Sequence, residues 1–374
     1  MLFLSPDFRK EPHVAYRSVT VDHLRLRRVI MALLRRAGSS AREAKACADH
    51  LVEANLKGHD SHGVGMIPAY VNNLLGGRLN LNQHIRVVKD GGSTAVVDGR
   101  LGIGQVVAME ATELAIARAR KHGVAVVALR NAHHIGRVGT YGERCAAAGL
   151  VSLHFVNVLD HDPWVAPFRG AEARFGTNPI CIAMPGGKGE HPIVLDFATS
   201  RVALGKVRVA KQRGKPVADG LVIDAKGRPT NDPNVMWANP HGSLVAFGEH
   251  KGYGLSLIAE LFAGALGGAG SIAPKNPRRG SIINGMLTVA IDPRRLGNPK
   301  AIVAERRAVI AYTKSARAAK RGLPVLVAGE PERIARAARI RAGIPIELAT
   351  WTDILAAGTA VGLPRAEALR IAGV

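Results

Sequence analysis

The chain has 374 residues, of which 47% are hydrophobic and 21% are charged, a composition typical of a globular protein with well-buried cores. Its apolar runs stay short of the roughly 18 residues that a membrane-spanning helix needs, which argues against a membrane span. The three cysteines, Cys47, Cys145 and Cys181, are widely spaced and fit neither a disulfide framework nor a zinc knuckle. They favour a reducing cytoplasm.

The charge balance is strongly basic, with 51 Lys and Arg against 29 Asp and Glu and a formal net charge of +22. Such an excess attracts polyanions and anionic ligands. Aromatic residues, which single-strand binders use as stacking platforms, make up only 4% of the chain. No basic tail or zinc-finger spacing is present either. The charge therefore favours an enzyme of anionic substrates over a specific nucleic-acid site, and a non-catalytic nucleic-acid-binding protein remains the alternative of a different class.

Residues 1–18 are expected to form a loose leader, because they are too polar and too interrupted by proline for a signal-peptide core. From Leu26 to Leu34 apolar residues recur at helical spacing, and Gly38 follows as a stop signal. Ser40, with Glu43 three residues later, forms a capping box that opens a second helix. The region up to residue 85 is therefore expected to be mostly helical.

From residue 86 the chain alternates short apolar runs with turn residues, as strands do. The expected strands cover 96–97, 124–129, 150–156, 180–184, 193–197, 243–247, 286–291 and 325–328, and the expected helices cover 105–121, 138–148 and 254–266. Residues 206–239 lack periodicity and are expected to form a surface excursion that could act as a lid. Helices return at 332–342 and 352–357.

Helices at both ends around a strand-rich middle predict an α/β protein in which the two termini pack together. On this interpretation residues 19–85 and 332–374 form one helical domain. Residues 86–331 form an α/β core inserted between them, which binds cofactor and substrate.

The segment Gly102–Val107 looks like a dinucleotide-binding fingerprint, since it carries two glycines between an apolar strand and a helix. A Rossmann fingerprint needs a third glycine for close helix packing, and Val107 occupies that position. It also needs an acidic residue after the next strand, where the chain has Arg130. The sequence therefore argues against a Rossmann fold.

Three polar clusters stand in loops, where rigid scaffolds present reactive groups: residues 58–63, 131–137 and 249–254. Histidine is the side chain best suited to transfer protons near neutral pH, and each cluster contains at least one. His59 with His62, or His133 and His134 with His161, could suggest zinc. No cysteine or carboxylate falls at a metal-binding spacing, so no metal is expected.

A serine hydrolase is also not expected. Ser61 is adjacent to His62, and neighbouring residues do not readily form a nucleophile–base pair. The chain has no G-x-S-x-G elbow.

At these clusters the sequence resembles the malate/L-lactate dehydrogenase family of NAD(P)-dependent oxidoreductases, and looks closest to its hydroxycarboxylate dehydrogenase B branch. The resemblance covers nearly the whole chain from about residue 20. The motifs that carry it are GHDSHGVGMIPAY at 58–70, NAHHIGRVG at 131–139, FGTNP at 175–179, LDFATS at 195–200 and HKGYG at 250–254.

This resemblance implies a homodimer with a three-layer α/β/α core and a mixed sheet, which binds NAD or NADP outside any Rossmann fold. His62 would donate a proton to the substrate oxygen or lie against the nicotinamide, with Ser61 beside it, and His134 is the second acid/base candidate. Asp196 would orient a histidine or a ribose. The residues implied to contact the cofactor are His62, Gly136, Arg137, Val138, Val194, Leu195, Asp196, Phe197, Ala198, His250, Lys251, Asn284, Ala328, Gly329, Glu330 and Pro331.

Two positions depart from the family pattern. Many relatives carry an arginine where this chain has Met66, so Arg137 is the candidate to hold the substrate carboxylate. The late turn usually begins with proline and here begins with Ala328. The expected reaction is hydride transfer that interconverts 2-hydroxy and 2-oxo acids, with histidine as acid/base. Reduction of a cyclic imino acid and oxidation of ureidoglycolate remain alternatives, and the sequence leaves the substrate, its stereochemistry and the choice of NAD or NADP open.

Overall fold

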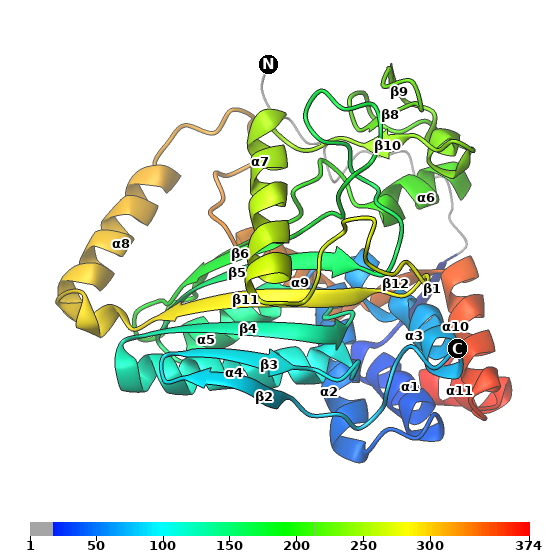
Figure 1. The fold of residues 1–374 in the computed structure, drawn as a ribbon, viewed down its shortest axis with the longest axis horizontal. Helices are drawn as coiled ribbons and strands as arrows, with labels where there is room; N and C mark the ends of the chain where they lie inside the picture. Colours follow the sequence, from blue (N-terminus) through cyan, green and yellow to red (C-terminus); the bar gives the residue numbers. More distant parts are fainter. Residues whose placement is uncertain (1–17, 213) are drawn as a thin grey trace.

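The computed structural model describes residues 18–212 and 214–374 (Figure 1). The expected leader, except for Ser18, lies outside these residues. Among the described helices, none has the length and apolar character needed to cross a membrane.

A seven-stranded sheet forms the centre of the molecule (Figure 1). Its strands, in spatial order, are β2 (Arg86–Gly91), β3 (Thr94–Asp98), β4 (Val124–His133), β11 (Ile283–Ile291), β5 (Val151–Leu159), β6 (Ile180–Met184) and β7 (Ile193–Phe197). Only β3 and β4 run parallel, and α4 (Gly104–His122) connects them. The other neighbours in this sheet are antiparallel. A sheet of this kind is mixed and is not the parallel sheet of a Rossmann fold.

Helices cover both faces of the sheet (Figure 1). One face carries α4 and α5 (Gly139–Ala147), and the other carries α7 (His250–Ala259) with its π-helical continuation, Glu260–Leu266. Alternate residues of β4, namely Ala125, Val127 and Leu129, are buried together with Val107 and Ala111 of α4. This alternation matches the period of two in a strand. The expected three-layer α/β/α core with a mixed sheet is confirmed.

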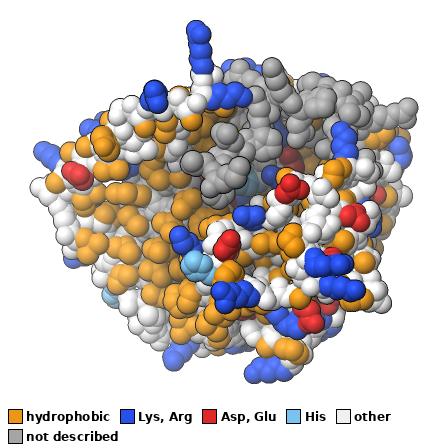
Figure 2. Space-filling view, turned by 90° about the horizontal axis from the view of Figure 1, so that it is seen from above, with side chains coloured by type: hydrophobic (Ala, Val, Ile, Leu, Met, Phe, Trp, Pro, Cys, Tyr) orange, Lys and Arg blue, Asp and Glu red, His pale blue; other side chains and the backbone are white. Residues whose placement is uncertain are grey.

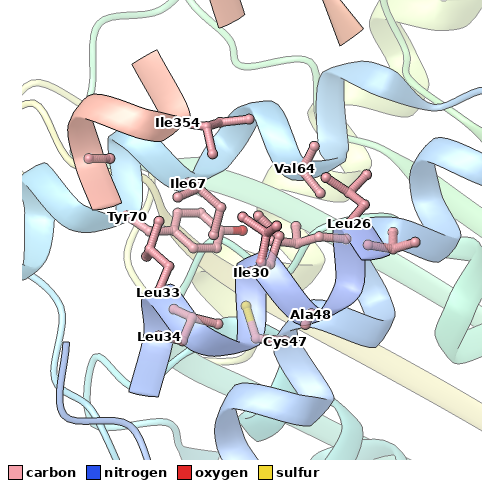
Figure 3. Close-up of a cluster of buried hydrophobic side chains, with 14 of the residues drawn as sticks. Leu26, Ile30, Leu33, Leu34, Cys47, Ala48, Val64, Ile67, Tyr70 and Ile354 are labelled. Carbon is pink, nitrogen blue, oxygen red and sulfur yellow. The ribbon is translucent and has the colours of Figure 1, made fainter. Parts of the chain in front are cut away.

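The two ends of the chain form a second, helical domain, also as expected. Its elements are β1 (Ser18–Val21), α1 (His23–Arg36), α2 (Ala41–Leu56), α3 (Ile67–Leu75), β12 (Ile344–Glu347), α10 (Leu348–Ala360) and α11 (Arg365–Ala372). β1 pairs antiparallel with β12, which joins the two ends directly. Figure 3 shows Leu26, Ile30 and Leu33 of α1 packed in one cluster with Ile354 of α10.

The capping box of the second helix is half formed. Ser40 Oγ accepts a hydrogen bond from Glu43 N over 3.2 Å, as the sequence predicts. The Glu43 carboxylate does not return to the cap. It accepts instead from Ser39 Oγ and from the backbone nitrogen of Asn82. The cap thereby also anchors the segment that leads from the helical domain into the sheet.

The segment expected as a surface excursion, residues 206–239, is more regular than its sequence indicates. It contains most of α6 (Leu204–Gln212), β8 (Val222–Ile223), β9 (Pro229–Thr230) and the 3-10 helix η3 (Pro233–Trp237). β8 pairs with β9 and with β10 (Ser243–Leu244). Val207, Val222 and Met236 are buried in a small hydrophobic cluster of their own. These residues stand too far apart in the sequence to show a period, which is why pattern reading missed the unit.

Two further elements differ from expectation. The predicted strand at 325–328 is not a strand, because this segment shares only one backbone hydrogen bond with β7, from Val194 N to Ala328 O. It links α8 (Pro299–Lys314), which was not predicted, to α9 (Glu330–Ala342). The glycine-rich helix expected at 254–266 begins earlier, at His250, and changes to π-helix at Glu260.

The two glycines of the failed fingerprint have a packing role. A Cβ on Gly104, the first residue of α4, would overlap the carbonyl oxygens of His133 and His134. A Cβ on Gly102 would lie 2.7 Å from that of Gln83. These glycines therefore let α4 begin directly against the end of β4, with no phosphate-binding function required.

Several histidines are fully enclosed in the structure. Burial lowers the pKa of His50 to about 3, of His133 to about 4 and of His154 to about 3. His154 lies within the sheet, where its two ring nitrogens contact Ser152 Oγ and Thr288 Oγ1, each at 3.0 Å. The folded protein therefore holds these rings neutral at pH values where an unfolded chain, with a histidine pKa of about 6.5, would protonate them.

We expect the free energy of unfolding to fall as the pH drops from about 6.5 to about 4, because in this window the unfolded chain binds protons that the folded chain does not. Each buried histidine contributes about 1.4 kcal/mol per pH unit. Urea denaturation at pH 7.5, 6, 5 and 4.5 measures the slope. His154→Gln keeps a polar side chain and should reduce the slope. An unchanged slope in this variant would contradict the histidine origin of the effect.

Candidate active site

The loop that carries His62 is the 3-10 helix η1 (Asp60–His62), and it is tied down on both sides. The Asp60 carboxylate accepts two hydrogen bonds from Arg339 of α9, at 2.6 and 2.9 Å, and one from Asn55 of α2, at 2.6 Å. A Cβ on Gly63 would overlap the Asn55 side chain, so the motif requires glycine there. The histidine therefore sits on a loop that both ends of the chain hold in place.

The structure brings His62, His134 and Ser61 together, three residues that the sequence analysis names as catalytic candidates. The rings of His62 and His134 are stacked, with centroids 5.5 Å apart and an interplanar angle of 21°. Ser61 Oγ lies 3.0 Å from His62 Nδ1. His62 is half-buried, whereas His134 is 8% exposed. His62 is therefore the ring of this pair that solvent reaches more easily.

Both rings are neutral at physiological pH. Burial, followed by electrostatic interaction with His59 and Arg137, lowers the pKa of His62 to about 4. Burial and the neighbouring histidines lower the pKa of His134 as well. A neutral imidazole can accept a proton from a hydroxyl group, and an anionic ligand would raise the pKa of the ring again.

Asp196, at the end of β7, contacts Arg137 and not a histidine. Its Oδ2 accepts from Gly139 N over 2.7 Å and lies 3.5 Å from Arg137 Nε. Burial raises the pKa of Asp196, and Arg137 opposes this shift. Arg137 Nη1 also donates to Glu143 over 2.9 Å, and the arginine is only 2% exposed. Its guanidinium is enclosed between two carboxylates, a geometry that does not favour the expected role of direct substrate binding.

In this region three buried polar atoms lack a hydrogen-bond partner within the described residues: Arg137 Nη2, Glu332 Oε2 and Arg137 Nε, which has only its 3.5 Å ion pair with Asp196. The other Glu332 oxygen lies 3.3 Å from His59 Nε2. An unpaired donor and an unpaired acceptor in one region are costly unless a ligand satisfies them. The carboxamide and ribose of a nicotinamide nucleotide carry both kinds of partner, so these residues fit the expected cofactor.

Other residues expected to contact the cofactor meet at the edge of the sheet. Val194 of β7 donates its backbone N–H to Ala328 over 3.4 Å. Gly329 has φ of +88°, and a Cβ on it would lie 3.5 Å from Val194 N. Glu330 then begins α9 and accepts from Val327 N over 2.9 Å. The structure thus brings the strand 194–198 and the late turn 328–331 side by side.

Three of the family-like motifs also converge. Thr199 of LDFATS donates its backbone N–H to Thr177 of FGTNP over 2.9 Å and accepts from Phe247 over 3.0 Å. Phe247 lies just before HKGYG, whose His250 and Lys251 are exposed at the start of α7. The ring of His250 contacts Phe168, with centroids 5.7 Å apart.

The remaining expected contacts lie on the inner side of the site. Asn284 Oδ1 accepts from Ile135 N over 3.0 Å, and its Nδ2 donates to the Asn157 carbonyl over 2.9 Å. Gly136 has φ of +74°, and a Cβ there would overlap His50, while Val138 is buried in the core. These residues therefore hold in place the backbone of the segment that carries His134.

The sequence analysis missed Tyr70, Gln105 and His50, which surround His134 and Arg137. Tyr70 Oη lies 2.7 Å from His134 Nδ1, and Gln105 Nε2 donates to Tyr70 Oη over 2.6 Å. His50 Nε2 accepts from the backbone of Arg137 over 2.9 Å. The available signals were a tyrosine that ends the longest motif and polar residues on otherwise apolar helix faces.

No group of three or more metal-ligating side chains occurs in the described parts of the chain.

The chain is similar to known proteins over most of its length. A family model described as malate/L-lactate dehydrogenase matches residues 21–355. Hydroxycarboxylate dehydrogenase B from Escherichia coli (strain K12) is 45% identical over 345 residues, which cover 92% of this chain and 94% of that protein.

Two solved structures are also similar. Sulfolactate dehydrogenase from Methanocaldococcus jannaschii has a TM-score of 0.82 at 33% identity, with 93% of this chain and 99% of that chain covered. Delta1-piperideine-2-carboxylate reductase from Pseudomonas syringae pvar. tomato has a TM-score of 0.75 at 30% identity, with 91% and 99% covered. The chain therefore belongs to the malate/L-lactate dehydrogenase family of oxidoreductases.

Proposed function

We propose that this protein is an NAD(P)-dependent dehydrogenase that interconverts 2-hydroxycarboxylates and 2-oxocarboxylates. The observation that carries the proposal is the stacked pair of neutral histidines, His62 and His134, in a chain that matches the family over most of its length. His62 is half-buried and reachable, which suits proton exchange with a bound substrate oxygen. Free, buried cysteines fit an enzyme of the cytoplasm.

In this mechanism the nicotinamide, when bound, supplies or takes up the hydride at C2 of the substrate. During reduction His62, protonated once the bound anion raises the pKa of its ring, gives that proton to the substrate oxygen, and during oxidation the neutral ring takes one from the hydroxyl group. The cofactor would lie along 194–198 and 328–331, with His250 and Lys251 as exposed cationic or hydrogen-bonding partners. Gly205 of α6 borders the histidine loop, since a Cβ there would lie 3.5 Å from Ser61 Cβ. This contact supports a covering role for the segment 206–239.

The substrate class rests on charge and on the relatives. With a net charge of +22 the protein attracts carboxylates, and the relatives are named for hydroxycarboxylate and sulfolactate. The reductase from Pseudomonas syringae motivates one alternative, a cyclic imino acid that carries a carboxylate. Its C=N bond would accept hydride as the 2-oxo group does.

Turnover of at least one 2-oxo acid with NADH or NADPH is the first expected outcome. Pure, folded protein is tested against pyruvate, oxaloacetate, 2-oxoglutarate, phenylpyruvate and a cyclic imino acid, with nucleotide absorbance as the measurement. Oxidation with the imino acid alone would move the proposal to the reductase alternative. No oxidation of either nucleotide across the panel would refute both.

Substitution of the histidines tests the site itself. We expect His62→Ala to lower kcat by about 10²–10⁴-fold, as for a positioned acid/base, with a smaller loss in His134→Ala. Thermal melting of both variants should stay close to that of the wild type. His84, an exposed histidine paired with Glu110, provides the control, and His84→Ala should keep normal kinetics. Near-normal kcat in His62→Ala would place proton transfer elsewhere.

We also propose that the protein is a homodimer. The outer face of α7 and its π-helical continuation carries large apolar side chains, namely Ile258, Leu261 and Leu266, which are 38–66% exposed. Phe262, 37% exposed, extends this apolar surface and also packs against Phe155 of β5. The inner face of the same helix packs on the sheet. Figure 2 looks down on the side that carries α7 and α8 and shows a broad field of hydrophobic side chains. Exposed patches of this kind usually mark protein–protein contacts.

Analytical ultracentrifugation should therefore give twice the chain mass of 39.5 kDa at micromolar concentration. Leu266→Glu places a charge in the proposed interface and should shift the equilibrium toward monomer. Leu75 on α3 is equally exposed, at 64%, so Leu75→Glu is the matched control and should remain dimeric. A wild-type protein that sediments as a monomer would contradict the homodimer.

A further inference from the structure

A chain of buried side chains reaches His134 from behind, and it comes from the helical domain and α4. Tyr70 Oη lies 2.7 Å from His134 Nδ1, Gln105 Nε2 donates to Tyr70 Oη over 2.6 Å, and Cys47 Sγ lies 3.7 Å from Gln105 Oε1. All three supporting residues are at most 2% exposed. Figure 3 shows Tyr70 and Cys47 in the same cluster of the helical domain. We call these three residues the Cys47–Gln105–Tyr70 chain.

The direction of hydrogen bonding along this chain follows from its chemistry. Burial raises the pKa of the Cys47 thiol and of the Tyr70 hydroxyl, so both keep their protons. The thiol donates to the Gln105 carbonyl oxygen, which leaves the amide nitrogen facing Tyr70, and an amide N–H can only donate. The Tyr70 oxygen is thus an acceptor toward Gln105, and its own proton is free for another partner.

That partner is the ring of His134. The two acceptors near the Tyr70 hydroxyl are His134 Nδ1, at 2.7 Å, and the His134 carbonyl oxygen, at 3.4 Å. The shorter contact is the stronger hydrogen bond. If Nδ1 accepts, a neutral ring must carry its proton on Nε2.

His62 is held differently. The partner of its Nδ1 is the Ser61 hydroxyl, at 3.0 Å, and a hydroxyl can donate or accept by rotating. His62 can therefore gain or lose a proton at no cost in hydrogen bonding. A proton on Nδ1 of His134, by contrast, would make the Tyr70 oxygen accept from both the ring and Gln105, and would leave the Tyr70 proton only the longer contact with the His134 carbonyl oxygen, at 3.4 Å.

We propose that the Cys47–Gln105–Tyr70 chain fixes His134 as the neutral tautomer with its proton on Nε2, so that His134 donates a hydrogen bond to the substrate oxygen while His62 transfers the proton. This inference rests on the proposed dehydrogenase function and assigns a different role to each of the two histidines. During reduction the hydride adds to C2, the oxygen takes one proton from the protonated His62 ring, which becomes neutral, and His134 keeps its own. Tyr70 and Gln105 are positioning residues.

The test combines NMR with kinetics. In protein labelled with ¹⁵N-histidine, the His134 signals are identified by their loss in His134→Gln, and long-range ¹H–¹⁵N correlations report which ring nitrogen is protonated. We expect Nε2–H in the wild type at pH 7. Tyr70→Phe removes the donor to Nδ1, so the tautomer should become mixed, and kcat should fall at least about 10-fold with little change in the substrate KM.

A second variant reverses the direction of the hydrogen bond between residue 105 and Tyr70 instead of removing it. Gln105→Glu puts a carboxylate acceptor beside Tyr70, which should turn the hydroxyl proton away from His134 and shift the ring toward Nδ1–H. Tyr141→Phe is the matched control, because Tyr141 is equally buried and donates to the carbonyl oxygen of Ile135 and to no histidine. It should leave the tautomer of His134 unchanged.

Two results would overturn the proposal: a wild-type His134 protonated on Nδ1, or a tautomer that responds equally to Tyr70→Phe and Tyr141→Phe. The NMR measurement needs no substrate, so its outcome is independent of the substrate panel. Lack of turnover by the wild type would refute the proposed function and leave the tautomer result standing.

Discussion

Gly104, at the start of α4, lies so close to the carbonyl oxygens of His133 and His134 that no side chain fits between them. This contact fixes the end of β4 against the first turn of α4, and with it the ring of His134. It also places Gln105 where it can reach Tyr70 of the helical domain. The sheet, the helix and the helical domain thus meet at one backbone approach, and the geometry of the histidine pair depends on it.

Around that point the fold encloses charges that water would otherwise stabilise. Arg137 is shared by Asp196 and Glu143, and Glu143 also binds Lys57 of the loop after α2, at 2.5 Å. Burying such charges is costly, and the attraction between them repays the cost only when the geometry is good. What the arrangement gains is orientation. Arg137, in the segment after β4, binds Asp196 at the end of β7, and through Glu143 it is linked to Lys57 after α2. These three segments of the site are therefore held together.

The sequence was sufficient for the fold class and for the failure of the Rossmann fingerprint, and it named Ser61, His62 and His134, which lie together in the structure, as candidates. Those predictions depend on local periodicity and on contiguous motifs, both of which are visible along the chain. The unit formed by α6, β8 and β9 was not predicted, because its core residues are separated by irregular segments and signal no period. The strand expected at 325–328 failed because an apolar run becomes a strand only where a neighbouring strand pairs with it.

In the site, too, local features were predicted and contacts between distant segments were not. The sequence analysis took Arg137 for an unpaired cation, because nothing along the chain indicates that Glu143 and Asp196 bind it. Tyr70 and Gln105 are 35 residues apart in the sequence and lie on different helices, α3 and α4. Only the fold brings them behind His134, so no pattern along the chain could link them to it. The motifs pointed to His62 and His134, whereas the contacts of Tyr70 with His134 and of Gln105 with Tyr70 are visible only in the structure.

The pairing of β1 with β12 has a consequence for how the protein is made. A ribosome releases α1 and α2 first, long before α10 and α11, which cover the apolar faces of the same cluster. The loop of His62 also waits for Arg339, which holds Asp60. Through most of synthesis the nascent chain therefore carries an uncovered hydrophobic surface and an unfinished site, a state prone to aggregation. The site can assemble only after Arg339 and the late helices α10 and α11 have been synthesised.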